Sequence, residues 1–231
     1  MSGDQLRLPL LDAPAPSLPY RVAPMQATPV DAPFDDPDYF FEPWWPGVRA
    51  LAFIEPRSLR LQVTGLSDPL AVFPELAELA AQVRDDGLIL DGTLMVLDDQ
   101  GRPDADLLRR RLEADDDLLR TGSPAYVASD LLWSDGASWM RRPFRARRDR
   151  LTSVLPSGDR VIAGRGYVRE GTLVAEALAA LGIDGLSARR LSARYRSGDA
   201  GDAWVRASLV PARPSARPTL ALILRLPLEL G

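Results

Sequence analysis

The chain has 231 residues and a net charge of −4, with 46% hydrophobic and 26% charged residues, as in an ordinary globular protein. It has no Cys and no His, and all 28 basic residues are Arg rather than Lys. These absences exclude disulfides, thiolate or imidazole catalysts and covalent lysine adducts. The acidic balance argues against non-specific coating of nucleic acid. Without a long apolar run or a secretory signal, we expect a cytoplasmic protein that does not span a membrane.

The texture of the chain divides it into three parts. Residues 1–24 are rich in Pro and lack an apolar period, which predicts an extended arm. Residues 25–210 have the mixed patterns of one globular domain. Residues 211–231 are expected to form a Pro-rich joint followed by a final strand.

The first half of the domain predicts strands and helices in alternation. Apolar residues at every second position indicate strands, and apolar stripes at helical spacing indicate helices. In chain order we expect a hairpin (48–54 with 58–63), a helix (73–83), two short strands that meet at Asp91-Gly92 (88–98) and a charged helix (104–113).

The second half continues with more strands than helices. The pattern predicts a buried strand (125–133), a very basic helix (141–155), a strand (160–168) and a helix that stops at Gly182 (170–181). Two strands (185–191 and 203–210) and a terminal strand (219–228) follow. Frequent hairpins with only a few helices favour the α+β class, with largely antiparallel sheets.

Several segments carry a family resemblance through their order. They read PMQATPVDAPFDDPDYFFEPWWPGVRALAF, FPELAEL, LILDGTLMVLDDQGRPD, AYVASDLLWSDG, RRPFRARRDRLTSVLP, GIDGLSARRLSARYRSG and AWVRASL. Over residues 24–209 this order resembles the adenylation domain of ATP-dependent DNA ligases, most closely the bacterial end-joining type. The resemblance implies an ATP-grasp-like nucleotidyltransferase fold of two largely antiparallel β-sheets flanked by helices. We expect no OB-fold domain of the kind usual in that family, because only about 20 residues follow Leu209.

The family's nucleophile is absent from the matching position. In that family a lysine of a Lys-x-Asp-Gly motif, preceded by Glu-Pro, attacks ATP and passes AMP to a DNA 5′-phosphate. The matching stretch here is FEPWWPGVRA. Trp44 stands at the lysine position and Pro46 at the aspartate position, whereas Glu42, Gly47 and Arg49 fit the pattern. The resemblance implies a ligase-like frame without its nucleophile and therefore without a catalytic residue.

Other family positions are altered as well. Thr93 stands where the family has a glutamate after Asp-Gly, and Ser129 where it has the aromatic residue that stacks on adenine. Asp184 and Arg189 stand at the two ends of the family's Glu-Gly-x-x-x-Lys motif. Arg206 and Ser208 stand at the two lysines of its Trp-x-Lys-x-Lys motif. We therefore predict a degenerate nucleotide pocket formed by Glu42, Trp44, Gly47, Arg49, Thr93, Ser129, Asp184, Arg189 and Arg206. We expect no cofactor and no metal site, since acidic pairs such as Asp35-Asp36 lack a spaced ligand set.

Two features each allow more than one interpretation. Trp44 either fills the vacated pocket, or forms a platform for a base or a partner side chain, or lies in an exposed patch. The Arg-rich stretch is either a solvated helix that pairs with acidic segments or a phosphate-contacting face for nucleic acid. The candidate residues of that face are Arg141, Arg142, Arg145, Arg147 and Arg148, with Arg109 to Arg111 and the group Arg189, Arg190, Arg194 and Arg196 as a possible extension.

The sequence favours a pseudoenzyme with a nucleotidyltransferase fold. Its expected role is DNA binding or scaffolding in a DNA-repair setting, with DNA or repair proteins as partners and without nucleotide binding. One alternative is a residual ligase or nucleotidyltransferase that uses a non-lysine route or a partner's residues. The other is a sensor that binds a nucleotide without reacting.

Overall fold

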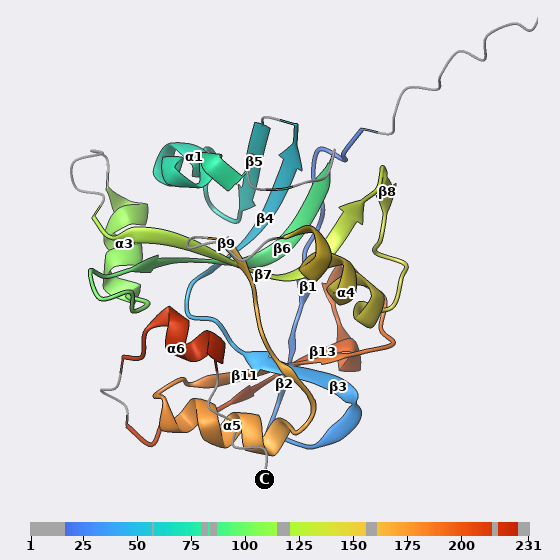
Figure 1. Cartoon of the computed structure of the whole chain (residues 1–231), viewed down its shortest axis with the longest axis vertical. Coiled ribbons are helices and arrows are strands. Elements are labelled where there is room, and N and C mark those ends of the chain that lie inside the picture. Colours follow the sequence, from blue (N-terminus) through green and yellow to red (C-terminus); the bar gives the residue numbers. More distant parts are fainter. Residues whose placement is uncertain are drawn as a thin grey trace, which may run out of the picture.

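Two main sheets form the framework of the computed structural model, which describes residues 17–56, 58–79, 83, 87–114, 121–155, 161–213 and 217–225. Figure 1 shows one sheet above the other. The upper sheet has the order β5-β4-β6-β7-β8, and β9 pairs in parallel with β7. Its strands are β4 (Val48–Glu55), β5 (Ser58–Val63), β6 (Leu88–Leu97), β7 (Ser123–Ser134), β8 (Ala137–Ser138) and β9 (Val161–Ala163).

The lower sheet has five strands in the order β10-β3-β11-β13-β2. All its pairs are antiparallel except β13 with β2. Its strands are β2 (Thr28–Val30), β3 (Asp36–Pro43), β10 (Tyr167–Arg169), β11 (Gly185–Arg190) and β13 (Trp204–Ser208). A short parallel pair, β1 (Met25–Gln26) with β12 (Gly198–Asp199), lies outside both sheets.

Helices flank the sheets. Helix α5 runs beneath the lower sheet, and α4 lies beside β7 of the upper sheet (Figure 1). The described helices are α1 (Pro69–Val72), α3 (Ala105–Glu113), α4 (Phe144–Val154), α5 (Gly171–Ala180) and α6 (Leu220–Arg225), with the 3-10 turns η1 (Pro74–Glu78) and η3 (Gly201–Ala203). The α+β class with largely antiparallel sheets flanked by helices is therefore confirmed. No described helix is long and apolar enough to cross a membrane.

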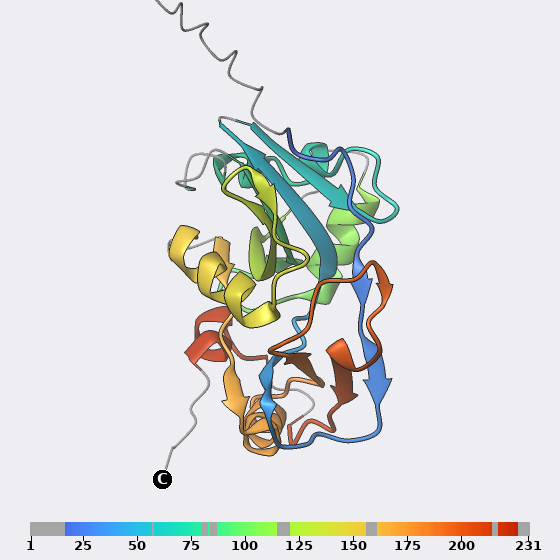
Figure 2. The same cartoon turned by 90° about the vertical axis from the view of Figure 1, so that its right-hand side faces the viewer.

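Apolar side chains from both sheets meet in the middle of the molecule. One core cluster packs the upper sheet against η1, α3 and α4 and includes Phe73, Leu90 and Tyr126. A second joins the lower sheet and α5 to the ends of β6 and β7, and includes Phe41 and Val174. Figure 2 shows the N-terminal stretch, in blue, descending from the upper sheet to the lower one. Residues 1–16 of the expected arm lie outside the described residues.

Three sequence predictions of secondary structure were wrong in detail. Residues 88–97 form one strand rather than two, because the pairing of β6 with β4 runs unbroken from Leu88 to Leu94. Gly92 permits the continuous strand because it has no side chain. A Cβ at this position would lie 2.3 Å from the Val127 carbonyl oxygen of β7. In place of the single strand expected over 160–168, the described residues form two strands, β9 and β10, which belong to different sheets. Of the helix expected over 73–83, Pro74–Glu78 is a 3-10 turn, and residues 80–82 lie outside the described residues.

The expected terminal strand is instead helix α6. Leu220 and Ile223, three residues apart, are both buried against the second core cluster. The Thr219 hydroxyl accepts a hydrogen bond from the Leu222 N–H at 3.2 Å, which satisfies a donor of the first turn. A short apolar run fits either element, and here the packing at helical spacing decides it.

Candidate functional site

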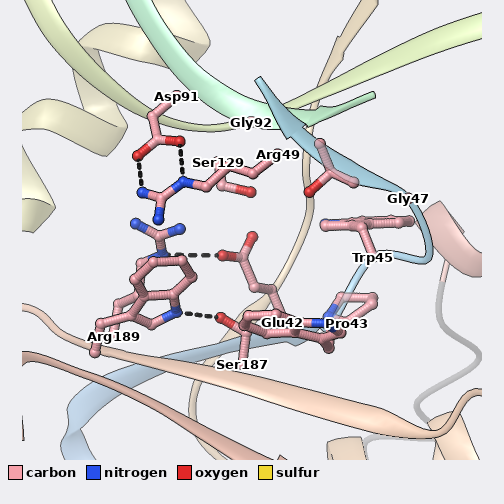
Figure 3. A pocket seen from close by; sticks show the side chains of 13 residues that line it. Glu42, Pro43, Trp45, Gly47, Arg49, Asp91, Gly92, Ser129, Ser187 and Arg189 are labelled. Atoms are coloured by element: carbon pink, nitrogen blue, oxygen red, sulfur yellow. Dashed lines mark hydrogen bonds and ion pairs between the residues drawn. The ribbon is translucent and has the colours of Figure 1, made fainter. Parts of the chain in front are cut away.

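A small cavity lies between the two sheets, where β3 leads into β4. Its volume is about 70 Å³. Figure 3 shows its lining, which comes from both sheets. The lining residues are Glu42, Pro43, Trp44, Trp45, Gly47, Arg49, Asp91, Gly92, Thr93, Ser129, Ser187, Arg189 and Trp204.

Seven of the nine predicted pocket residues line this cavity. Arg206 lies just outside, with its guanidinium 4.4 Å from the centre of the Trp44 ring. Asp184 faces a separate cavity beside Pro46. The structure thus gathers most of the predicted set in one place, while the role assigned to each residue remains a prediction.

The backbone around Trp44 is held in a tight frame. Strand β3 ends at Pro43, and the Trp44 N–H donates to the Gly185 carbonyl at 2.9 Å. A Cβ at Gly185 would lie 2.7 Å from the Cβ of Trp44, and one at Gly47 would lie 2.3 Å from the Leu94 carbonyl oxygen. Both glycines are therefore required by close approach rather than by turn geometry.

Indole and guanidinium groups stack against one another in the cavity, and we call this set the aromatic column. Trp44 stacks on Trp204 with ring centres 5.8 Å apart. Arg206 covers Trp44, while Arg189 and Arg49 lie 4.1 Å and 4.6 Å from the Trp204 ring. The Trp204 Nε1–H donates to the Ser187 hydroxyl at 2.9 Å. Cation–π contacts of this kind stabilise the packing of charged groups beside indoles.

Arg49 forms a bidentate ion pair with Asp91 on the upper side of the cavity (Figure 3). The Arg49 Nε donates to Asp91 at 2.8 Å, and the Tyr195 hydroxyl donates to the same carboxylate at 2.7 Å. Burial acts to raise the pKa of Asp91, but the Arg49 guanidinium outweighs it and holds that pKa below its ordinary value. Arg49 also donates to the Met25 carbonyl, which ties the N-terminal stretch to the site.

A second buried network joins α4 to both sheets. Arg147 forms two hydrogen bonds of 2.8 Å with Asp130, and both side chains are almost fully buried. Arg189 bridges Asp130 and Glu42, with contacts of 3.3 Å to each. Asp130 was not among the residues predicted from the sequence, although a charged residue inside a buried strand indicates a partner of opposite charge.

Glu42 lies in this network with one oxygen left over. Its Oε2 has no hydrogen-bond partner among the described residues, nor does the nearby Nε1 of Trp45. Burial raises the pKa of Glu42, against the lowering effect of the Arg189 and Arg148 guanidiniums. Both orphaned atoms are buried, and a Cβ at Gly164 would lie within 3.4 Å of each, so the lining is not fully satisfied by the protein alone.

Ser129 reaches the cavity because β7 contains a bulge. Asp130 pairs with Asp91 and Ala128 pairs with Gly92, so Ser129 is the extra, unpaired residue. A bulge re-aims the side chain of the strand at that point. Thr93 lies on the neighbouring strand, β6. No group of three or more acidic residues among those described could hold a metal ion.

The predicted arginine face is divided by the fold. Arg147 is buried in the Asp130 pair, and burial lowers the pKa of Arg148, which lies 5.2 Å from the Phe40 ring. Arg147 was therefore wrongly assigned to an outer face, whereas Arg148 is half-buried. The other three, Arg141, Arg142 and Arg145, are exposed.

Two arginines of the loop after β11 join the exposed three. The loop is held against α4 by hydrogen bonds of Phe144 to Ala193 and of Tyr195 to Met140, each 2.8 Å. We name the resulting surface the arginine face. It consists of Arg141, Arg142, Arg145, Arg194 and Arg196, none of which has an ion-pair partner among the residues described.

Comparison with known proteins identifies a matching family. A family model described as ATP dependent DNA ligase domain matches residues 24–207. The chain is 24% identical over 189 residues to the multifunctional non-homologous end joining protein LigD of Mycolicibacterium smegmatis, covering 81% of this chain and 24% of that protein. It is 32% identical over 149 residues to a DNA ligase of Haloferax volcanii, covering 61% of this chain and 25% of that protein. The chain thus spans about a quarter of the length of these relatives.

Solved structures agree with this match. The fold resembles mycobacterial DNA ligase D complexed with ATP and MES, with a TM-score of 0.69, 26% identity, and coverage of 80% of this chain and 60% of that one. It also resembles the ligase domain of LigD from M. tuberculosis, with a TM-score of 0.68, 26% identity, and coverage of 80% and 58%.

Proposed function

The chain belongs to the family of ATP-dependent DNA ligase domains, and from this membership we propose that it is a member that does not form a covalent adenylate. The observation that carries the proposal is chemical. The attacking group of the family is a lysine amine, and this chain has no Lys at all, with Trp44 at the matching position. Arginine cannot replace it, because its guanidinium does not lose a proton at physiological pH.

The size and filling of the cavity support the further proposal that the chain does not bind a nucleotide. Pockets for drug-sized ligands have volumes of about 300 Å³ or more, whereas this one has about 70 Å³. The indoles of Trp44 and Trp204 and the Arg49–Asp91 pair line it. A similar structure, mycobacterial DNA ligase D, was solved with ATP. In this chain we propose that the aromatic column fills the corresponding space.

Incubation with α-labelled ATP and Mg²⁺ tests the first part. No covalent label is expected, and an active ATP-dependent ligase treated in parallel serves as the positive control. A stable protein–AMP adduct would overturn the proposal. Thermal unfolding with millimolar ATP tests the second part, because a ligand that binds only the folded state raises the melting temperature. A clear rise would instead support a nucleotide sensor.

A specific surface favours DNA binding as the role that remains. The arginine face presents five guanidiniums without ion-pair partners among the described residues, and guanidinium groups suit the phosphates of a DNA backbone. The indole of Trp139 is buried beneath Arg142 at 4.0 Å, so it offers no exposed ring for base stacking. We therefore propose backbone binding without sequence readout. A scaffold that binds repair proteins is the alternative.

The arginine face can be tested with a charge-matched pair of variants. R141Q/R145Q is expected to weaken binding to nicked duplex DNA and to lower the slope of log affinity against log salt by about two. R109Q/R110Q removes the same charge from α3 and should leave the slope unchanged. The measurement is fluorescence anisotropy from about 50 mM to about 200 mM salt. Equal slopes for the two variants, or no binding by the unmodified chain, would leave the scaffold role.

A further inference from the structure

A larger groove than the pocket lies beside α6, on the side of β9. Its volume is about 510 Å³. Apolar side chains of three separated segments line it: Leu97 at the end of β6, Ile162 of β9, and Leu220 with Leu224 of α6. This groove shares no lining residue with the small cavity between the sheets.

The wall formed by α6 is fixed in place. The Leu220 N–H donates to the Gly101 carbonyl at 2.8 Å, and the Ile223 side chain is fully buried in the second core cluster. Arg217, just before the helix, forms ion pairs with Asp104 and Asp98. These contacts hold the α6 wall of the groove in one position, which reduces the entropic cost of binding.

Two positive charges lie among the lining residues. Arg165 and Arg225 are both exposed, and neither pairs with a carboxylate anywhere in the described part of the chain. The neighbouring acid Asp98 is already engaged by Arg102 at 2.8 Å. A ligand with an anionic group would therefore meet two guanidiniums that no described carboxylate neutralises, and guanidiniums bind carboxylates, sulfonates and phosphates.

We propose that this groove binds a small amphipathic anion, a molecule with an apolar body and an anionic head. The volume lies within the range of about 300–1,000 Å³ typical of small-molecule sites. The Leu and Ile side chains suit the apolar body, and Arg165 with Arg225 suits the head. A nucleotide is disfavoured because no aromatic side chain is among the lining residues that could stack on a base.

Fluorescence titration with 8-anilinonaphthalene-1-sulfonate, itself a small amphipathic anion, tests the site. Saturable binding is expected, with decanoate displacing the dye and uncharged decanol displacing it much less well. R165Q/R225Q should weaken dye binding about tenfold, because charge-assisted hydrogen bonds are lost. The charge-matched control R109Q/R110Q should bind as the unmodified chain does.

A second variant tests the apolar part separately. Ala221 lines the groove from an exposed position of α6, so A221W should block it while both arginines remain. Thermal unfolding confirms that each variant folds. Unchanged dye affinity in both R165Q/R225Q and A221W would overturn the proposal. Equal displacement by decanol and decanoate would overturn the anionic class of the ligand.

Discussion

Asp91 is the carboxylate that balances the buried charge of the pocket. It is 1% exposed and accepts hydrogen bonds from Arg49 and Tyr195. We predict that D91N destabilises the protein by about 3 kcal/mol, because breaking a buried pair leaves the remaining charge uncompensated. Urea unfolding measures this. The control D106N removes an exposed carboxylate of α3 and should change the free energy of unfolding by less than about 1 kcal/mol. Similar values for both variants would contradict a stabilising role of the pair.

Glu42 predicts a dependence of stability on pH. Burial raises the pKa of Glu42 in the folded state. The contribution of the neutral Glu42 side chain to the free energy of unfolding is therefore fully present below the unfolded-state pKa and is lost as the pH rises through the folded-state pKa. E42Q cannot ionise, and its stability relative to the unmodified chain should therefore increase from about pH 4 to about pH 8. Urea unfolding across this range measures the difference. E113Q, an exposed change on α3, is the charge-matched control, and a trend no larger than that of the control would count against burial as the cause.

Individual pocket residues were predictable from the sequence only where a motif marked them. The frame around Trp44 and the positions of Thr93, Ser129 and Arg189 follow from the order of the family motifs, and the structure places all four at one cavity. Tyr195 has no such mark. It reaches Asp91 because the loop after β11 folds back against α4, and no local pattern encodes that long-range contact.

At the scale of elements, helix α6 shows how far periodicity can be used. The stretch LALILR is a short apolar run that fits a strand as well as a helix, yet its buried side chains lie three positions apart. The basic helix α4 and the apolar-faced helix α5 were predicted correctly, because each extends over three turns with a consistent stripe. The short strands β9 and β10 were merged in the prediction, since only tertiary pairing separates them into two sheets.

The burial of α6 leads to a prediction of its own. Ile223 is fully buried, so I223A should destabilise the protein by about 2–5 kcal/mol through the cavity that it leaves. Leu222, on the same helix, is 42% exposed, and L222A should cost much less. Urea unfolding of both variants gives the comparison. Equal small effects would mean that α6 does not contribute to the core in solution.

At the scale of the whole molecule, the cleft between the sheets is closed by contacts from both sides. Arg189 of the lower sheet reaches Asp130 of the upper sheet, and Tyr195 reaches Asp91. The aromatic column occupies the space between these contacts. Under the proposed function, the missing lysine and the filled cleft are two separate obstacles to adenylylation, and removing one is expected not to restore the reaction.

The variant W44K separates these two obstacles. It returns a lysine to the family position but leaves Pro46, Thr93 and Ser129 unchanged, and Trp204 remains covered by Arg189. We predict no protein–AMP adduct by intact-mass spectrometry after incubation with ATP and Mg²⁺. W44A, which removes the indole without adding an amine, is the control for the loss of packing. Because Trp44 is half-buried, this loss should cost less than the loss of a fully buried ring, which costs about 3–5 kcal/mol. An adduct on W44K would mean that the cleft still admits ATP and that the absent amine alone stops the reaction.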